Sequence, residues 1–310
     1  MVTDAGALKD TATAAVTVTA PTNAAPTAVI AGTPGGNEGS AIAFSSAGSS
    51  DPENTTLTYA WNFGDGSGST LANPSHSYAD NGTYAVTLVV TDGAGLASAV
   101  ATRNVTIANV IPSGSFGRPS SVTEGSTYTL RVTGATDAGP ADRTTLEYQF
   151  DCGDGAFGPW GSATSRVCPA FPDERAPVVL RGQMRDKDGG VRTFNVTTRA
   201  TTSVVNARPV VRLRAMSGTT EVTSRTATVG QSVSFRLSFT DAGVNDAPWG
   251  YVINWGDGTA TTTGPINPGT AGRITQSHAF ATTGVKNVVA TVRDVDGGVG
   301  TSRTIVITVQ

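Results

Sequence analysis

Asparagine and aspartate side chains recur in three sets along the chain, and their oxygens are the kind of ligand that calcium takes in proteins. In each set an Asn is followed by two Asp residues. The Asn and the first Asp are 28 residues apart in the first two sets and 35 apart in the third. The candidate calcium ligands are Asn23, Asp51 and Asp92; Asn109, Asp137 and Asp186; and Asn206, Asp241 and Asp294. A bound ion would be structural, clamping each linker to its domain; the alternative is that all nine are ordinary turn and cap residues.

Two histidines and three Gly-Asp-Gly corners are the other residues that suggest chemistry. A nucleophilic triad needs a serine or cysteine, a histidine and an acid at one site. His76 and His278 each stand two residues before an aromatic residue, so they recur with a repeat instead of converging. Asp65, Asp154 and Asp257 lie between glycines in separate repeats, where an Asp side chain bonds local backbone amides. We therefore expect these residues to be structural and the chain not to be an enzyme.

Cys152 and Cys168 are the chain's two cysteines, 16 residues apart. A disulfide that closes a loop of this size stabilises a domain by about 3 kcal/mol. Two buried thiols are the alternative. The sequence predicts the disulfide, which would imply an oxidising compartment.

Trp160 and Trp249 stand in Gly- and Pro-flanked stretches that we expect to be loops. An exposed tryptophan can stack on a sugar ring or fill a pocket of a partner. The alternative is that each covers the end of a domain. Both are kept as candidate ligand contacts.

The residues before each corner alternate in the period of a strand with one buried face. Tyr59, Trp61 and Phe63 precede the first corner, and similar triplets precede the other two. Glycine then ends the strand because it accepts the positive φ of a tight turn. The strands expected in the first full repeat are 29–30, 41–45, 57–63, 84–90 and 97–107, and 304–309 is expected to be the last strand of the chain. Short strands separated by turn signals predict an all-β chain of tandem immunoglobulin-like two-sheet β-sandwiches.

Composition excludes several kinds of partner. Charged residues make up 15% of the 310 residues, and the net charge is −3 with Lys and Arg scattered. That balance argues against nucleic acid as a partner. No apolar run approaches the roughly 18 residues of a membrane span, so we expect no membrane insertion in this segment.

The linkers repeat as Asn-x-x-Pro at 23–26, 109–112 and 206–209. They divide the chain into 1–22, 23–110, 111–207 and 208–310. The first piece, with a strand expected at 16–18, is interpreted as the terminal hairpin of a truncated preceding domain. Proline stiffens such short linkers, so we expect adjoining domains with little hinging.

Several motifs in fixed order resemble the PKD domain (polycystic kidney disease repeat). The first copy has Trp61–Gly66, Pro74–Tyr78, Gly82–Tyr84 and Val89–Asp92. The third copy is similar at Trp255–Gly258, Ser277–Phe280 and Val292–Asp294. The middle copy departs, with Pro169-Ala170-Phe171 in place of His-x-aromatic and Cys152 in the place of Phe63. The resemblance implies a PKD domain at 23–110, a divergent PKD or immunoglobulin-like domain at 111–207 and a PKD-like domain at 208–310. It also implies an extracellular setting, roles in binding, spacing or adhesion, and, as in some secreted bacterial enzymes, calcium near a linker.

These features favour a non-catalytic structural or adhesive segment of a secreted or cell-surface protein. Such a stalk or spacer would mediate surface attachment or contacts with proteins. One alternative is an accessory region of a secreted hydrolase that binds polysaccharide or another polymer, which would need Trp160 and Trp249 exposed on one face. Another is a subunit of an extracellular filament or virion that self-associates through residues 1–20.

Overall fold

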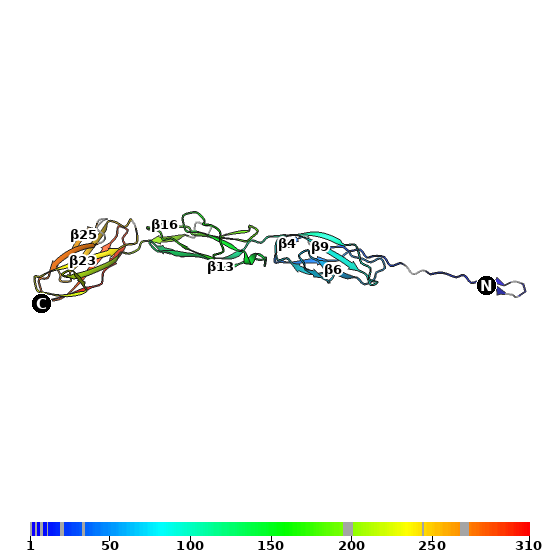
Figure 1. Cartoon of the computed structure of the whole chain (residues 1–310), viewed down its shortest axis with the longest axis horizontal. Coiled ribbons are helices and arrows are strands. Elements are labelled where there is room, and N and C mark those ends of the chain that lie inside the picture. The colour runs from blue at the N-terminus through cyan, green and yellow to red at the C-terminus, as the bar shows by residue number, and fades with distance from the viewer. Residues whose placement is uncertain are drawn as a thin grey trace. The chain divides into compact units, whose positions relative to one another are not determined.

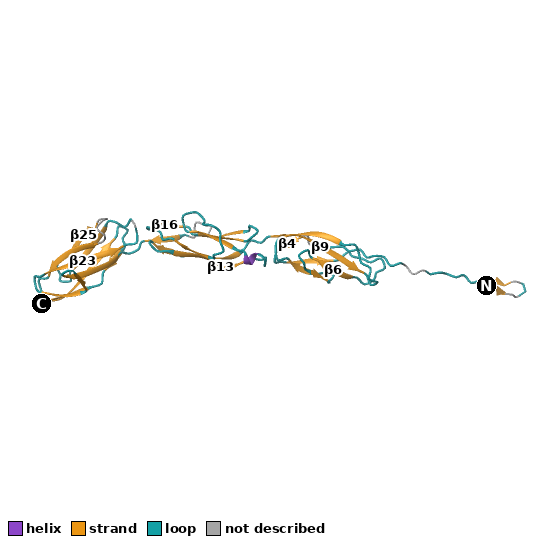
Figure 2. Cartoon of the chain, viewed as in Figure 1, coloured by secondary structure: helices purple, strands orange, loops and turns teal. Residues whose placement is uncertain are grey.

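Strands dominate the computed structural model, and the one helix among the described residues is the short 3-10 helix η1 (Asp142–Thr144) (Figure 2). The structure describes residues 2–3, 5–6, 9–10, 12–18, 22–32, 35–194, 201–243, 245–266 and 273–310. Within them, no helix is long and apolar enough to cross a membrane. The predicted all-β class is confirmed.

The chain forms two compact units, residues 1–110 with 138–144, and residues 111–137 with 145–310. Buried apolar side chains form one cluster in the first unit and two in the second. The clusters span residues 42–107, 122–204 and 213–309.

The first unit holds a five-stranded sheet, β4-β10-β9-β6-β7, and a three-stranded sheet, β3-β5-β8. Trp61 and Phe63 point inward because the strand alternates, and both are buried with Tyr78. β6 and β9 pair side by side in the larger sheet (Figure 1). The strands are β3 (Ala31–Gly32), β4 (Gly35–Asn37), β5 (Ala41–Ser45), β6 (Thr58–Asn62), β7 (Gly68–Ser69), β8 (Ser75–Ser77), β9 (Gly82–Thr91) and β10 (Ala101–Ala108).

The second unit begins with three three-stranded sheets, β11-β13-β15, β12-β19-β16 and β14-β17-β18. They enclose the cluster that includes Leu130, Leu180 and Met184, all fully buried. The strands are β11 (Ser113–Gly117), β12 (Ser121–Thr123), β13 (Tyr128–Thr136), β14 (Glu147–Asp151), β15 (Ser165–Cys168), β16 (Arg175–Val178), β17 (Arg181–Arg185), β18 (Val191–Phe194) and β19 (Thr202–Val205).

The rest of the second unit is a sandwich of β21-β20-β23-β26 against β22-β29-β27-β24-β25, with β28 paired to β27. Trp255 and Phe235 fill its core, with ring centroids 5.2 Å apart. The strands are β20 (Val210–Ser217), β21 (Thr220–Val222), β22 (Ser224–Ala227), β23 (Ser232–Thr240), β24 (Trp249–Asn254), β25 (Thr262–Ile266), β26 (Arg273–Ala279), β27 (Gly284–Arg293), β28 (Val299–Thr301) and β29 (Ile305–Val309).

One topological feature occurs in all three sandwiches. A short early strand pairs in parallel with the last strand: β4 with β10, β12 with β19, and β22 with β29. All other strand pairs described here are antiparallel. The shared parallel pair therefore indicates that the three sandwiches have the same fold.

The predicted strands agree with the structure except at their edges. Residues 41–45 form β5, 57–63 contain β6, 84–90 lie inside β9, and 304–309 contain β29. The strand expected near 29–30 begins slightly later, at Ala31 of β3, and 97–107 forms a strand only from Ala101.

The expected strand at 16–18 is also wrong. β1 (Val2–Thr3) pairs instead with β2 (Lys9–Asp10), and residues 12–18 form no strand. Val16 and Val18 are 82% and 86% exposed, because the described residues offer them no sheet on which to pack. The division into 1–22, 23–110, 111–207 and 208–310 stays a prediction.

Candidate metal centre

The corner aspartates are held by local hydrogen bonds, as their position between glycines predicts. Asp65 Oδ1 accepts hydrogen bonds from the amide (3.0 Å) and hydroxyl (2.5 Å) of Ser67. Its Oδ2 lies 2.7 Å from Nε2 of His76, whose ring stacks on Phe63 with centroids 4.3 Å apart. The His76 imidazole therefore links the corner to the core and has a structural role.

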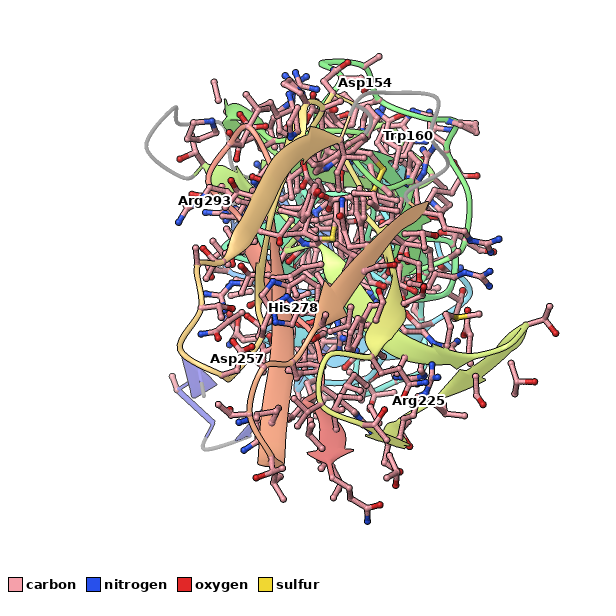
Figure 3. All side chains as sticks on the ribbon, turned by 90° about the vertical axis from the view of Figure 1, so that its left-hand side faces the viewer. Asp154, Trp160, Arg225, Asp257, His278 and Arg293 are labelled. Atoms are coloured by element: carbon pink, nitrogen blue, oxygen red, sulfur yellow. A yellow bond between two sulfur atoms is a disulfide. The ribbon has the colours of Figure 1, made fainter. Side chains whose placement is uncertain are left out.

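The third sandwich repeats this corner with other side chains. Asp257 accepts from the amide and hydroxyl of Thr259, and its Oδ2 lies 2.7 Å from Nε2 of His278 (Figure 3). His278 stacks on Trp255 with centroids 4.6 Å apart. Burial alone would raise the pKa of Asp257, but the bonds from Thr259 and His278 outweigh it and lower the pKa to about 2.

The first corner also brings a hydroxyl, an imidazole and a carboxylate together, but not in the order of a triad. Ser67 Oγ lies 3.3 Å from Nε2 of His76, the same ring nitrogen that contacts Asp65. A catalytic histidine uses one ring nitrogen for the nucleophile and the other for the acid. This geometry therefore cannot activate Ser67 in the way a triad does.

The corner of the middle sandwich is built differently. Asp154 accepts from the amide of Ala156 (3.1 Å), and neither of the two histidines of the sequence lies in this sandwich. The predicted disulfide is confirmed: Cys152 and Cys168 are joined, with Cα atoms 5.6 Å apart. The bond connects the end of the corner strand to β15, the segment that corresponds to the one carrying His76 in the first sandwich.

The second unit gathers acidic side chains where the middle sandwich meets the third. Carboxylate oxygens of Glu124, Asp241 and Asp246 lie within 4.8 Å of one another. Glu124 follows β12 of the middle sandwich, and the two aspartates lie in the loop between β23 and β24 of the third. Asp246 also groups with Asp173 and Asp296 within the same distance. Glu124 is 1% exposed and Asp246 is 0% exposed, so these charges are shielded from water.

Asn206 and Asp294 lie near this cluster, because the charge of Asp294 acts on both Asp241 and Asp246, and the residue after Asn206 is bonded to Glu124. We call the five residues the junction site: Glu124, Asn206, Asp241, Asp246 and Asp294. A Cβ atom placed on Gly298 would lie 2.1 Å from Asp294 Oδ2 and 3.0 Å from Asn206 Oδ1, so both oxygens face that glycine. The structure thus brings together the third predicted set, Asn206, Asp241 and Asp294, and adds Glu124 and Asp246 to it.

Several oxygens of the junction site have no hydrogen-bond partner among the described residues. They are Glu124 Oε2, Asn206 Oδ1, both carboxylate oxygens of Asp246, and Asp294 Oδ2. Burial, then the nearby charges of Glu124 and Asp241, raise the pKa of Asp246 to about 7. Burial also raises the pKa values of Glu124 and Asp241. Within the described residues, no Lys or Arg forms an ion pair with any of the five.

The first predicted set is held mainly by protein hydrogen bonds. The Asn23 amide donates to Asp92 Oδ2 (2.7 Å), and this bond lowers the pKa of Asp92. Asp51 Oδ2 accepts from the amide (2.8 Å) and hydroxyl (2.9 Å) of Thr55, whose hydroxyl oxygen also accepts from the Gly93 amide. Turn and cap bonds therefore account for most of this set.

The second predicted set is divided between the two units, with Asn109 in the first and Asp137 and Asp186 in the second. Asp186 Oδ1 accepts from the amides of Asp188 (2.9 Å) and Gly190 (2.8 Å). These are turn bonds of the same kind as those at Asp92, which accepts the amides of Ala94 and Leu96.

The first unit contains its own acidic cluster, in which oxygens of Glu38, Asp80 and Asp142 lie within 4.8 Å of one another. Glu38 Oε1 accepts from the amide of Val110 (2.7 Å), the residue after the linker Asn109. Glu124 Oε1 accepts in the same way from Ala207 (2.6 Å), the residue after Asn206.

Sequence reasoning missed Glu124 and Asp246, although two repeated motifs mark them. Glu-Gly-Ser occurs at 38–40 and again at 124–126. Asp-Ala-Gly-x-x-Asp occurs at 137–142 and again at 241–246. Each Glu is clustered with the second Asp of the motif in the next repeat. A search for aspartates that follow the predicted ones at the same spacing would have found Asp142 and Asp246, and the repeated Glu-Gly-Ser would have indicated the two glutamates.

The two candidate ligand-contact tryptophans are half-buried. Arg185 places its guanidinium 4.5 Å from the ring centre of Trp160, which is marked in Figure 3. Trp249 was expected in a loop but begins β24, where it packs edge-on against Phe239 and donates from Nε1 to Asp241 Oδ2 (3.0 Å). The alternating pattern of β24 starts two residues earlier than expected, because Trp249 shares the inward face with Tyr251.

Comparison with known proteins identifies the first sandwich. The family model for the PKD domain matches residues 23–107. A microbial collagenase of Vibrio alginolyticus is 47% identical over 85 residues, which is 27% of this chain and 10% of that protein. Collagenase ColA of Bacillus cereus is 48% identical over 54 residues, 17% of this chain and 6% of that protein. The chain thus matches a tenth or less of the length of these relatives.

Solved structures give similar matches. The PKD1 domain of Vibrio anguillarum Epp is 34% identical and covers 28% of this chain and 100% of that domain, with a TM-score of 0.24. The PKD domain of an M14-like peptidase from a Thermoplasmatales archaeon is 22% identical, with coverages of 34% and 98% and a TM-score of 0.28. The chain is an array of tandem PKD- and immunoglobulin-like β-sandwich domains, and residues 23–107 form its PKD domain.

Proposed function

We propose that this chain is a non-catalytic spacer in a secreted or cell-surface protein, holding other parts of that protein at a set distance from a surface. Successive sandwiches can fix a distance only if they do not hinge freely at their linkers. The observation that carries the proposal is the packed junction between the middle and third sandwiches within the second unit.

The junction is packed through both main chain and side chains. Gly125 lies against Ala242, since a Cβ atom on Gly125 would be 2.5 Å from the Ala242 Cβ. The linker amide of Ala207 is bonded to the buried Glu124 carboxylate. Asn245 donates to Asp173 Oδ2 (2.5 Å), adding a further bond across the junction. Contacts of this kind restrict the angle between two sandwiches, as a spacer requires.

The disulfide supports an extracellular setting. Disulfides persist in oxidising compartments and are rare in the reducing cytosol. The Cys152–Cys168 bond lies inside the middle sandwich and joins two segments of its core.

A distance measurement tests the spacer proposal. Spin labels carried by non-canonical amino acids replace the exposed Val167 of the middle sandwich and the exposed Val285 of the third. Pulsed electron resonance should give one narrow distance distribution. Gly125→Ala should broaden it, because the added methyl group collides with Ala242. A broad distribution in the unsubstituted chain, typical of a free hinge, would rule out the spacer.

Gly134→Ala is the matched control for that variant. Gly125 and Gly134 lie in the same sandwich with φ angles of +68° and +61°, so alanine strains both backbones alike. A Cβ atom on Gly134 would have no other atom within 4 Å. Only the Gly125 variant should therefore change the distance distribution.

A second candidate function is a polymer-binding accessory region of a secreted hydrolase. It is supported by the sequence identity of the PKD domain to regions of two collagenases. The test is co-sedimentation of the chain with insoluble collagen and, separately, with insoluble polysaccharide. Retention that falls several-fold in Trp160→Ala would support this function, and a chain that stays in the supernatant with every polymer would exclude it.

A further inference from the structure

We propose that a calcium ion binds at the junction site and is shared by two successive sandwiches, with Glu124 supplied by the middle sandwich, Asn206 by the linker, and Asp241, Asp246 and Asp294 by the third. The ion would add a set of metal bonds to the protein contacts that already cross this linker. This inference goes beyond the spacer function, because the ion can bind whether or not the chain sets a distance.

The site offers oxygens that protein groups leave unused. Glu124 Oε1 is occupied by the Ala207 amide, but Oε2 has no partner. Asp294 Oδ1 accepts from the Gly298 amide (2.6 Å), while Oδ2 has none. Both oxygens of Asp246 lack a partner although the residue is fully buried. A buried carboxylate without a hydrogen bond or counter-ion is costly, so a cation is the partner that this arrangement lacks.

The kind of donor selects the kind of metal. All five side chains offer oxygen, and no histidine or cysteine belongs to the cluster, which disfavours zinc and other transition metals. The five side chains would supply at least five oxygens, and Glu124, Asp246 and Asp294 among them are buried. Calcium takes six to eight oxygens and gives up water readily, whereas magnesium keeps several waters and an octahedral shell. We therefore assign calcium.

Two glycines leave room for two of the proposed ligand carboxylates. A Cβ atom on Gly298 would fall 2.1 Å from Asp294 Oδ2, and one on Gly243 would fall 2.1 Å from Asp246 Oδ1. Any larger residue at either position would push a carboxylate out of place. Neither glycine has a positive φ that would by itself demand glycine, so the space beside the carboxylates accounts for both.

Trp249 provides a signal that is local to the junction site. Its indole Nε1 donates to Asp241 Oδ2 (3.0 Å). An ion that binds the Asp241 carboxylate would therefore change the environment of the indole ring. Binding events elsewhere in the chain would leave Trp249 unaffected.

The test is calorimetric titration of CaCl₂ into the full chain after chelation, with tryptophan fluorescence recorded in parallel. We expect heat together with a fluorescence change that disappears in Trp249→Phe. Asp246→Asn and Glu124→Gln should each weaken that event at least tenfold, because each removes a charged ligand. Gly298→Ala should weaken it too, through crowding, and is an independent check if a charge variant folds poorly.

Asp257→Asn is the control, since it changes a buried acid of the same sandwich whose oxygens are already bonded. It should titrate within about twofold of the unsubstituted chain. The proposal is overturned if calcium gives neither heat nor a Trp249 signal. It is also overturned if Asp246→Asn weakens binding while Glu124→Gln does not, since the ion would then belong to the third sandwich alone. Neither result changes the outcome of the spin-label distance measurement that tests the spacer, because that measurement can be made in the presence of a chelator.

Discussion

Buried aspartates of the third sandwich occur in two opposite settings. At the corner, Asp257 receives hydrogen bonds from Thr259 and contacts His278, and its pKa is lowered to about 2. At the junction, Asp246 has two carboxylate oxygens without partners, and burial raises its pKa to about 7. Both side chains are shielded from water, so burial alone does not distinguish them.

The difference distinguishes an acid whose hydrogen-bond partners are part of the fold from an acid that is buried without such partners. A carboxylate that is part of the fold has its partners within a few residues or across one strand, as at Asp257. The Asp246 carboxylate is instead surrounded by like charges, from Glu124 and Asp241, and both of its oxygens lack a hydrogen-bond partner. Substitutions at the two places should therefore change stability in opposite directions.

The largest effect is expected for Asp246→Asn in chelator at pH 8. A pKa raised from 3.8 to about 7 means that the fold opposes the ionised form by about 4 kcal/mol. Removing the charge should raise the free energy of unfolding of the third sandwich by about 2 to 4 kcal/mol, measured by denaturant titration. A loss of stability would show that Asp246 already has its partner in the protein, and the contrast with Asp257 would fail.

Loss of the disulfide is expected to have the next largest effect. The middle sandwich lacks the histidine–aspartate corner, and Cys152–Cys168 joins the corresponding segments. The Cys152→Ser, Cys168→Ser double variant should lower the stability of this sandwich by about 3 kcal/mol, the value for a loop of this length. Calorimetric unfolding should show one transition shifted down and the others unchanged; a shift of every transition would mean that the bond does not act on this sandwich alone.

Asp257→Asn should lower the stability of the third sandwich by about 2 kcal/mol at pH 7, because its pKa falls from 3.8 to about 2 on folding. A depressed pKa adds stability above the unfolded value, and that stability disappears as the pH falls through about 2. The difference between variant and unsubstituted chain should therefore shrink from pH 5 to pH 2, as followed by thermal unfolding. A difference that does not change with pH would mean that the charge of Asp257 does not contribute.

The sequence was enough to predict the sandwiches because strand period and turn chemistry are local. The triplet Tyr59, Trp61 and Phe63 and the glycines after it determine one strand and its corner without reference to the rest of the chain. Residues 16–18 have the same local pattern but pair with no sheet among the described residues, so there the prediction was wrong.

The junction site was only partly predictable because its residues meet through the fold. Asn206, Asp241 and Asp294 could be selected since they recur with the repeat, whereas Glu124 lies in the preceding sandwich. Its part in the cluster depends on the packing of Gly125 against Ala242. That contact joins two repeats, so the spacing of residues within one repeat cannot predict it.

The smallest effect is expected at the first corner and compares the two histidine–aspartate pairs directly. The side chain of Asp65 is 22% exposed, compared with 4% for Asp257, although both lie 2.7 Å from a histidine. Water screens the more exposed pair, so Asp65→Asn should cost about 0.5 to 1 kcal/mol at pH 7. Added salt should reduce that loss, since it screens an exposed pair more than a buried one. Denaturant titration of both variants in low and high salt checks the comparison. An equal loss of unfolding free energy at the two corners would contradict it. The hydroxyl and amide bonds, which are the same at both corners, would then contribute more than the burial of the ion pair.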